Sequence, residues 1–323
     1  MILYANPGYN SLLKNYPYNT SEEAGVNNTI TGTNIQLRPH EQYPLYESEN
    51  IFSTYRYSMS FDFYRNKDGN KTYLPIVRLV TDNTTYKYID LVLNNDDYSM
   101  SIYLSNSNDV LSIDNRKTVL TAEHLFCLDK LTNISMHVLL KTKDGKNPYI
   151  EIKFNNIEVY TVDLSTYYTE NNIINTYIGN NSKDSSYYFS NIVTSNELDK
   201  SKKCIVVPIQ IDSTSWTKNK DIYYADSPNQ KINYSANVSD FNNKNYYIDN
   251  ETNIYGIAMG SEKAYTDGNG NVKMLIDNVL LNTITLNKDK KGIITNIIEK
   301  NPSNDFTWNI NSLSQADFTI QSE

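Results

Sequence analysis

The sequence predicts an all-β protein made of antiparallel strands, and three observations support this class. The 323 residues include 28 Tyr, against 9 Phe and 2 Trp, and Tyr, like Ile, Val and Thr, favours a half-buried pleated surface over a helix interior. Apolar and polar residues alternate in many short runs, which is the period of a strand. Clusters of Asn and Asp separate these runs and favour turns. Strands in close succession without helices between them indicate an antiparallel β-sandwich rather than a βαβ fold.

Residues 1–50 are predicted to form an irregular N-terminal arm. Pro7, Pro17, Pro39 and Pro44 interrupt short polar runs in this segment, and proline removes a backbone donor and fixes φ. Such an arm cannot bury a core by itself. We therefore expect it to wrap onto the following domain or to reach a neighbouring subunit.

A first β domain is expected over residues 51–198. Alternation places Tyr57, Met59, Phe61 and Phe63 on one face of a strand, as expected for the buried side of a sheet. Further strands are expected at 74–80, 88–93, 98–104, 133–141, 149–154, 157–163, 175–180 and 187–193, with a tight Asp144-Gly145 turn between the fourth and fifth of these.

A second, smaller β domain is expected over residues 204–323. The segment 196–203 is polar, charged and without periodicity, so it is the predicted linker. One short helix is expected at 311–316, capped by Asn311 or Ser312, because both side chains accept backbone hydrogen bonds at helix starts. Strands of this domain are expected at 204–209, 222–224, 246–248, 254–260, 263–265, 272–276, 280–281 with 283–286, and 293–299.

Charge and composition exclude several classes of function. The net charge of -8 argues against a nucleic-acid partner, whose phosphates would require a basic surface. No apolar run is long enough to span a membrane, and the first residues lack the pattern of a signal peptide. Only two cysteines, Cys127 and Cys204, are present, which excludes a disulfide scaffold and a four-cysteine zinc site. No cofactor is expected.

No catalytic residue is assigned from the sequence. Cys127 stands three residues after His124, which permits a nucleophile–base pair, but its neighbours are apolar and a core role is favoured. His137 lies in an alternating strand and is expected to be structural.

The carboxylates leave one catalytic alternative open. Asp62, Asp90, Glu151 and Glu158 all lie near predicted strands, and a polysaccharide-cleaving enzyme would need two carboxylates facing each other across a groove. Alternation instead places Asp62 and Glu151 on the solvated side of a half-buried sheet.

One segment imitates the start of a calcium loop. Asp267, Asn269 and Asn271 supply oxygens at alternate positions, but Asn278 stands where an EF-hand requires a bidentate Glu. A hairpin tip is therefore expected, and no metal site is assigned.

Aromatic residues give the candidate binding contacts. Trp216, Tyr187, Tyr223 and Tyr246 are the residues chosen, the three tyrosines because each belongs to a Tyr doublet. Such rings stack on sugars, and they also bury interface area at low entropic cost. Core or interface packing is favoured over sugar binding.

The segment 55–195 resembles the concanavalin-A-like (laminin-G-like) jelly-roll family. The residues that carry the resemblance are Asn175–Gly179, with its Ile-Gly ending, and the closing segment Tyr188–Glu197. The resemblance implies a jelly-roll sandwich. The acidic metal ligands of legume-type lectins are not recognisable, so sugar binding does not follow from it.

The segment 204–323 resembles a β domain of tailed-phage virion structural proteins and tail fibres. Asn309-Ile310 departs from the small residues that usually follow Trp308. The resemblance is carried by Ile254–Ala258, Lys263–Gly268, Glu299–Pro302, Phe306–Trp308 and Ile310–Phe318.

The two resemblances imply a non-enzymatic structural or adhesion component of a tailed phage or phage-tail-like particle, such as a tail fibre, collar or head decoration. The expected partners are further copies of the chain, with a trimer favoured, other virion proteins and a host-surface glycan. The expected location is the virion, or else secretion to the surface of a Gram-positive bacterium. The alternative is a carbohydrate-binding lectin module of a clostridial toxin or surface protein.

Overall fold

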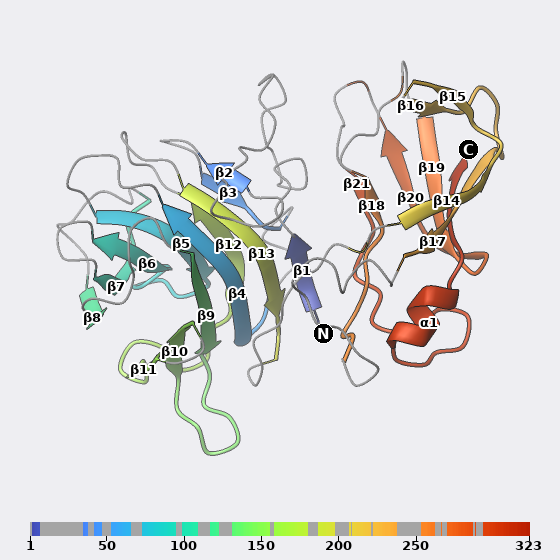
Figure 1. Cartoon of the computed structure of the whole chain (residues 1–323). Helices are drawn as coiled ribbons and strands as arrows, with labels where there is room; N and C mark the ends of the chain where they lie inside the picture. The colour runs from blue at the N-terminus through green and yellow to red at the C-terminus, as the bar shows by residue number, and fades with distance from the viewer. Residues whose placement is uncertain are drawn as a thin grey trace. The chain divides into compact units, whose positions relative to one another are not determined.

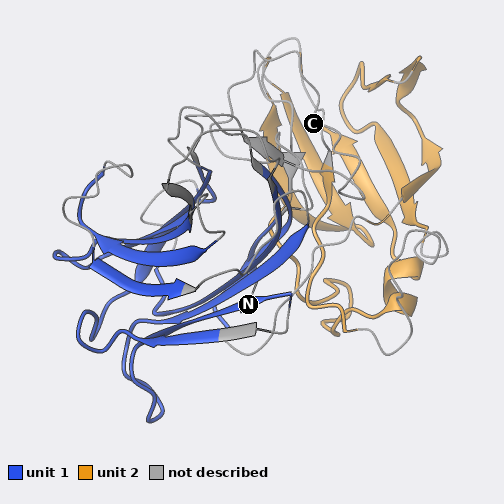
Figure 2. Ribbon diagram, turned by 60° about the vertical axis from the view of Figure 1, so that its left-hand side comes forward, with its two compact units in different colours: residues 1, 3–204 blue, residues 2, 205–323 orange. Residues whose placement is uncertain are grey.

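Strands dominate the computed structural model of the chain, and they form two separate units whose boundary follows Cys204 (Figure 2). The predicted all-β, antiparallel class is confirmed, because the paired strands of both units run antiparallel. The structure describes residues 2–6, 35–37, 42–46, 53–65, 73–94, 99–108, 117–122, 131–155, 158–179, 187–197, 207, 209–220, 222–237, 253–261, 266, 270–286, 288 and 293–323.

The first unit is a sandwich of two sheets, which we call sheet A and sheet B (Figure 1). In each sheet some neighbouring strands are consecutive in the sequence, whereas others come from its distant parts, such as the last strand of the unit beside an early one, as in a jelly roll. Sheet A has the order β1 (Ile2–Asn6), β13 (Tyr187–Ser195), β4 (Arg56–Arg65), β9 (Thr132–Leu139), β10 (Tyr149–Phe154) and β11 (Glu158–Asp163), and β2 (Ile35–Leu37) also pairs with β13. Sheet B has the order β3 (Gln42–Pro44), β12 (Ile173–Gly179), β5 (Tyr73–Thr81), β6 (Tyr88–Asn94), β7 (Met100–Ser105) and β8 (Lys117–Ala122).

The core of this unit lies between the two sheets. The predicted buried face of β4 is confirmed, since Tyr57, Met59, Phe61 and Phe63 are all buried there. The Phe189 ring packs 5.5 Å from that of Phe63. Alternation thus gives each strand one side that packs inside the sandwich and one side that points outward.

The described parts of residues 1–50 belong to this sandwich. β1 and β2 both pair with β13 in sheet A, and β3 pairs with β12 in sheet B. Leu45 and Tyr46, just after β3, are buried in the core. These strands therefore complete sheet edges that would otherwise expose unpaired backbone groups.

The predicted Asp144-Gly145 turn is confirmed. Asp144 and Gly145 have φ values of 53° and 75°, and Lys143 and Lys146 exchange two backbone hydrogen bonds of 3.1 and 2.9 Å. Positive φ at both central positions is the geometry that a two-residue hairpin requires, and Gly adopts it without strain.

The second unit is built on one five-stranded sheet, sheet C. One face of sheet C is apolar, and Ile276 and Phe318 on this face pack against Trp308. The sheet has the order β14 (Ile209–Thr214), β17 (Lys231–Ala236), β22 (Phe318–Ser322), β19 (Gly270–Ile276) and β20 (Val279–Leu286), and short pairs form between β15 (Thr217–Asn219) and β16 (Ile222–Tyr224) and between β18 (Gly260–Ser261) and β21 (Ile293–Ile294).

The predicted short helix is present as α1 (Ile310–Gln315), but its predicted cap is wrong. The N-cap is Asn309, whose side chain accepts a hydrogen bond from the backbone N–H of Ser312, while the Ser312 hydroxyl accepts one from the backbone N–H of Asn309. This reciprocal capping box satisfies two helix-start donors at once, so the helix begins earlier than expected. The described residues contain no helix long and apolar enough to cross a membrane.

Candidate functional site

Four side chains form a continuous row across the outer face of sheet B. Tyr177 on β12 stands opposite Arg78 on β5, Arg78 opposite Asp90 on β6, and Asp90 opposite Tyr103 on β7. All four alternate with residues that pack in the core, so they lie on the side of the sheet that points away from it. We call these four residues the sheet B row.

The centre of the sheet B row is a buried ion pair. The Nε and Nη2 atoms of Arg78 donate to the two carboxylate oxygens of Asp90 at 2.7 and 2.9 Å. The two side chains are only 4% and 0% exposed. Ser105, two residues from Tyr103 on β7, is also close to the carboxylate, with its hydroxyl 3.4 Å from Asp90 Oδ2. Such bidentate pairs fix geometry strongly, but removing both charges from water costs as much as their attraction returns.

Further contacts hold the guanidinium in place. The Arg78 Cζ atom lies 4.1 Å from the centre of the Tyr88 ring, which is a cation–π contact. Arg78 Nη1 donates to the carbonyl oxygen of Asn108 at 3.1 Å, and the Tyr88 hydroxyl donates to the Asn108 side chain. The plane of the Arg78 guanidinium is thus held along two edges, by Asp90 and by the Asn108 carbonyl, and on one face by the Tyr88 ring.

Two tyrosines mark the ends of the row. Tyr103 and Tyr177 are partly exposed, whereas the ion pair between them is buried. They stand three strand spacings apart, which is roughly 14 Å. Other outward-pointing side chains of the same face are also buried, and they mix hydroxyl, amide and apolar groups: Val80, Val92, Ser101, Ser105 and Asn175.

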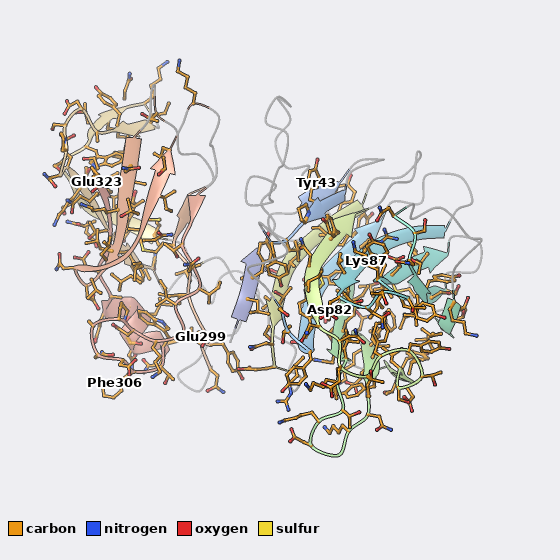
Figure 3. All side chains as sticks on the ribbon, turned by 180° about the vertical axis from the view of Figure 1, so that it is seen from behind. Tyr43, Asp82, Lys87, Glu299, Phe306 and Glu323 are labelled. Atoms are coloured by element: carbon orange, nitrogen blue, oxygen red, sulfur yellow. The ribbon has the colours of Figure 1, made fainter. Side chains whose placement is uncertain are left out.

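Loops beside the row, at the end of β5 and the start of β12, are tied together by side-chain hydrogen bonds. Asp82 follows β5, and its carboxylate accepts from the side chains of Asn171 and Asn172 at 3.1 and 2.9 Å (Figure 3). Asn83 donates to the carbonyl oxygen of Tyr167 at 3.0 Å. The turn after β5 and the segment before β12 therefore form one braced rim.

The outer face of sheet A carries a different row. His137 on β9 stands opposite Ser58 on the neighbouring strand β4 and opposite Glu151 on the other neighbour, β10. Ser58 and His137 are buried, and the Glu151 carboxylate lies 3.0 Å from Lys153 Nζ. The expectation that His137 is a structural residue remains a prediction.

The predicted contact residues lie elsewhere. Trp216 is half-buried and packs against a hydrophobic cluster of the second unit. The centre of the Tyr223 ring lies 5.4 Å from Lys218 Nζ. Tyr187 belongs to β13 through its backbone, and nothing is described of its side chain; Tyr246 lies outside the described residues. None of these four residues belongs to the sheet B row.

The carboxylates named from the sequence are divided between the sheets. Asp62 lies on the outer face of sheet A, where its oxygens accept from Asn133 and Asn191 at 2.7 and 2.5 Å. Asp90 lies on sheet B with Arg78. The sequence interpretation missed this pair, although a single Arg within the apolar run 74–80 was a signal that a buried partner exists.

In the described part of the chain, no group of three His, Cys, Asp or Glu residues is placed to hold a metal ion. Asp267, Asn269, His124 and Cys127 lie outside the described residues. The interpretations made for them stay predictions.

Comparisons with known proteins concern the fold. No protein-family model and no curated protein matches the chain. Among solved structures, it is similar to an endo-β-1,4-glucuronan lyase from the fungus Trichoderma reesei, with 10% identity, a TM-score of 0.41 and coverage of 61% of this chain and 96% of that one. It is similar to the CBM40 of the Ruminococcus gnavus IT-sialidase, with 10% identity, a TM-score of 0.37 and coverage of 53% and 94%. It is similar to the carbohydrate recognition domain of Emp46p, with 13% identity, a TM-score of 0.35 and coverage of 51% and 80%.

These comparisons contradict the expectation of a non-enzymatic protein. The similar structures include the glucuronan lyase and several alginate lyases, one of them from a Chlorella virus, and lyases are enzymes. The expectation rested on the lack of a catalytic sequence motif. That reasoning was weak, because a sandwich assembles its sites from strands that are far apart in the sequence. The solved structures to which the chain is similar thus include both enzymes and carbohydrate-binding proteins.

Proposed function

We propose that the first unit binds carbohydrate on the outer face of sheet B, along the sheet B row. The observation that carries the proposal is the row itself, in which two partly exposed tyrosines stand on either side of the buried pair Arg78–Asp90. Sugar rings have apolar faces that pack on aromatic rings and hydroxyl edges that need polar partners. The row presents two tyrosine rings with their polar hydroxyls on either side of a fixed charge pair that lies just beneath the surface.

The spacing of the tyrosines suits an oligosaccharide rather than a single sugar. Tyr103 and Tyr177 are roughly 14 Å apart across three strand spacings, so a chain of a few sugar units can reach both rings. Between them, the buried Arg78–Asp90 pair and the Ser105 hydroxyl hold polar groups at fixed positions just beneath the surface. Aromatic rings beside a few fixed polar groups are typical of small-molecule sites.

The buried pair favours a role in recognition over one in stability. Arg78 and Asp90 point away from the sandwich core, and a charge pair removed from water contributes little net stability. Its rigid geometry instead fixes the polar atoms before a ligand arrives. Preorganisation of this kind lowers the entropic cost of binding.

A glycan array followed by titration of the bound sugars tests the proposal. The full chain should bind at least one glycan, and Tyr103→Ala and Tyr177→Ala should each weaken that binding by about tenfold, the loss of one stacking and hydrogen-bonding side chain. Tyr149→Ala is the matched control, because Tyr149 is a partly exposed tyrosine on β10 of sheet A. Chromatography of the glycan after incubation shows whether it is also cleaved.

Two results would overturn the proposal. One is that the full chain binds no member of a broad array, and the other is that Tyr149→Ala weakens binding as much as the two row variants. The expectations of a phage particle, of a trimer with virion partners and of a virion or cell-surface location stay predictions.

A further inference from the structure

We infer that the sheet B row selects neutral sugars and disfavours sugars that carry a carboxylate. This inference rests on the proposed function, because it names the ligand class of the same site. It follows from the state of Arg78, which is the residue in the row that would be expected to bind an acidic sugar.

Recognition of a carboxylate normally uses the planar fork of an arginine, with two parallel N–H donors. In this protein one fork of Arg78 is already occupied by a carboxylate from the chain itself. Nε and Nη2 both donate to Asp90, and Nη1 donates to the carbonyl oxygen of Asn108. The Tyr88 ring lies 4.1 Å from Arg78 Cζ on one face of the guanidinium.

The local charge leads to the same conclusion. Arg78 and Asp90 sum to zero, and both are almost fully buried, so their interaction is weakly screened. A sugar carboxylate placed on the row would approach the like charge of Asp90 and gain no net positive charge in return. A neutral sugar that lies over the buried pair meets no such charge penalty.

Lys87 is a further cation near the row. Lys87 Nζ is 5.6 Å from the centre of the Tyr88 ring, and its side chain is partly exposed (Figure 3). Its attraction for an anion is screened by water and salt. The inference therefore predicts that Lys87→Gln leaves the choice between neutral and acidic sugars unchanged.

The test compares sugars that differ only in the carboxylate. Pairs such as β-1,4-glucan and β-1,4-glucuronan hexasaccharides, or sialylated glycans and their asialo forms, are added to the array. For each neutral glycan that binds, its carboxylated counterpart should bind at least about tenfold more weakly to the full chain. Equal or tighter binding of the carboxylated member overturns the inference and leaves the proposed function standing. Binding of no glycan at all overturns both.

A gain-of-function variant provides the second arm. Asp90→Asn keeps the shape of the side chain but leaves the Arg78 charge uncompensated, so it should raise the affinity for the carboxylated member by about tenfold or more. Glu151→Gln is the matched control, since it removes one negative charge from the outer face of sheet A. If folded Asp90→Asn gains no affinity for carboxylated sugars, Arg78 does not set the preference and the inference is wrong. The comparison on the unmodified chain decides the matter even if the variant does not fold.

Discussion

The buried pair Arg78–Asp90 gives the sharpest test of the structural argument, through a double-mutant cycle. Arg78→Met removes the cation and leaves the Asp90 carboxylate buried at 0% exposure, with Ser105 Oγ at 3.4 Å as its remaining hydrogen-bond partner among the described side chains. Asp90→Leu leaves the guanidinium with the Tyr88 ring and one carbonyl oxygen. Each single substitution should lower the free energy of unfolding by about 3–5 kcal/mol.

The double variant Arg78→Met/Asp90→Leu should behave differently. With both charges gone, no uncompensated ion is left in the protein, and the free energy of unfolding should lie within about 1 kcal/mol of that of the unmodified chain. The two single costs would sum to about 6–10 kcal/mol, so the contrast is large. Arg56→Met is the control. Arg56 forms an equally short ion pair of 2.7 Å with Asp144, but the two side chains are 37% and 66% exposed, so its loss should cost less than about 1 kcal/mol.

The assay is urea denaturation followed by two signals. Both tryptophans, Trp216 and Trp308, lie in the second unit, so tryptophan fluorescence follows that unit and should be unchanged in all four variants. Far-ultraviolet circular dichroism also records the first unit, where the change is expected. The reasoning is refuted if Arg78→Met costs no more than Arg56→Met. It is also refuted if the double variant loses more than about 3 kcal/mol, because the pair would then be a major source of stability.

Two further predictions concern stability. Burial raises the pKa of Tyr57 to about 12, whereas a tyrosine in the unfolded chain ionises near 10. The contribution of Tyr57 to the free energy of unfolding is therefore complete below pH 10 and falls by about 1.4 kcal/mol per pH unit between about pH 10 and pH 12. Tyr57→Phe should remove that part of the alkaline loss of stability, and an unchanged pH slope would contradict this. In the second unit, a Cβ at Gly256 would lie 2.7 Å from Ile297 Cγ2, so Gly256→Ala should cost about 1–3 kcal/mol. Tryptophan fluorescence during denaturation measures this cost, and Gly270→Ala, where the nearest atom is 3.3 Å away, should cost less.

Local patterns predicted the fold well because they depend on neighbours in the sequence. The alternation from Tyr57 to Phe63 correctly predicted the buried face of β4. The Asp144-Gly145 pair correctly predicted a turn, because its positive φ values favour those residue types. The helix α1 was also expected, although its cap was placed two or three residues too late. There the competing signal was another Asn, because Asn309 and Asn311 are equally good capping residues by type.

The candidate site could not be predicted in the same way, because it depends on register between distant strands. Alternation shows that Arg78 and Asp90 point outward, but their pairing depends on a register shift between Pro75 and Val77. Tyr177 joins the row from a strand that follows in sequence after most of the sandwich is complete. A one-residue change in either register would move these side chains to the core face.

The contrast between the two outer faces explains why we place the ligand on sheet B rather than on sheet A. Both faces carry buried polar side chains, so burial of polar groups alone does not identify a site. On sheet A, the aromatic pair Tyr64 and Tyr188 packs edge to face at 5.8 Å, and both side chains are buried, whereas Tyr103 and Tyr177 on sheet B are partly exposed. On sheet B, Tyr103 and Tyr177 are separated by the buried pair, which keeps them apart by three strand spacings. A sugar chain that lies across the strands can therefore contact a partly exposed aromatic ring at each end and lie over the fixed buried pair between them, and this arrangement makes binding on sheet B the stronger hypothesis.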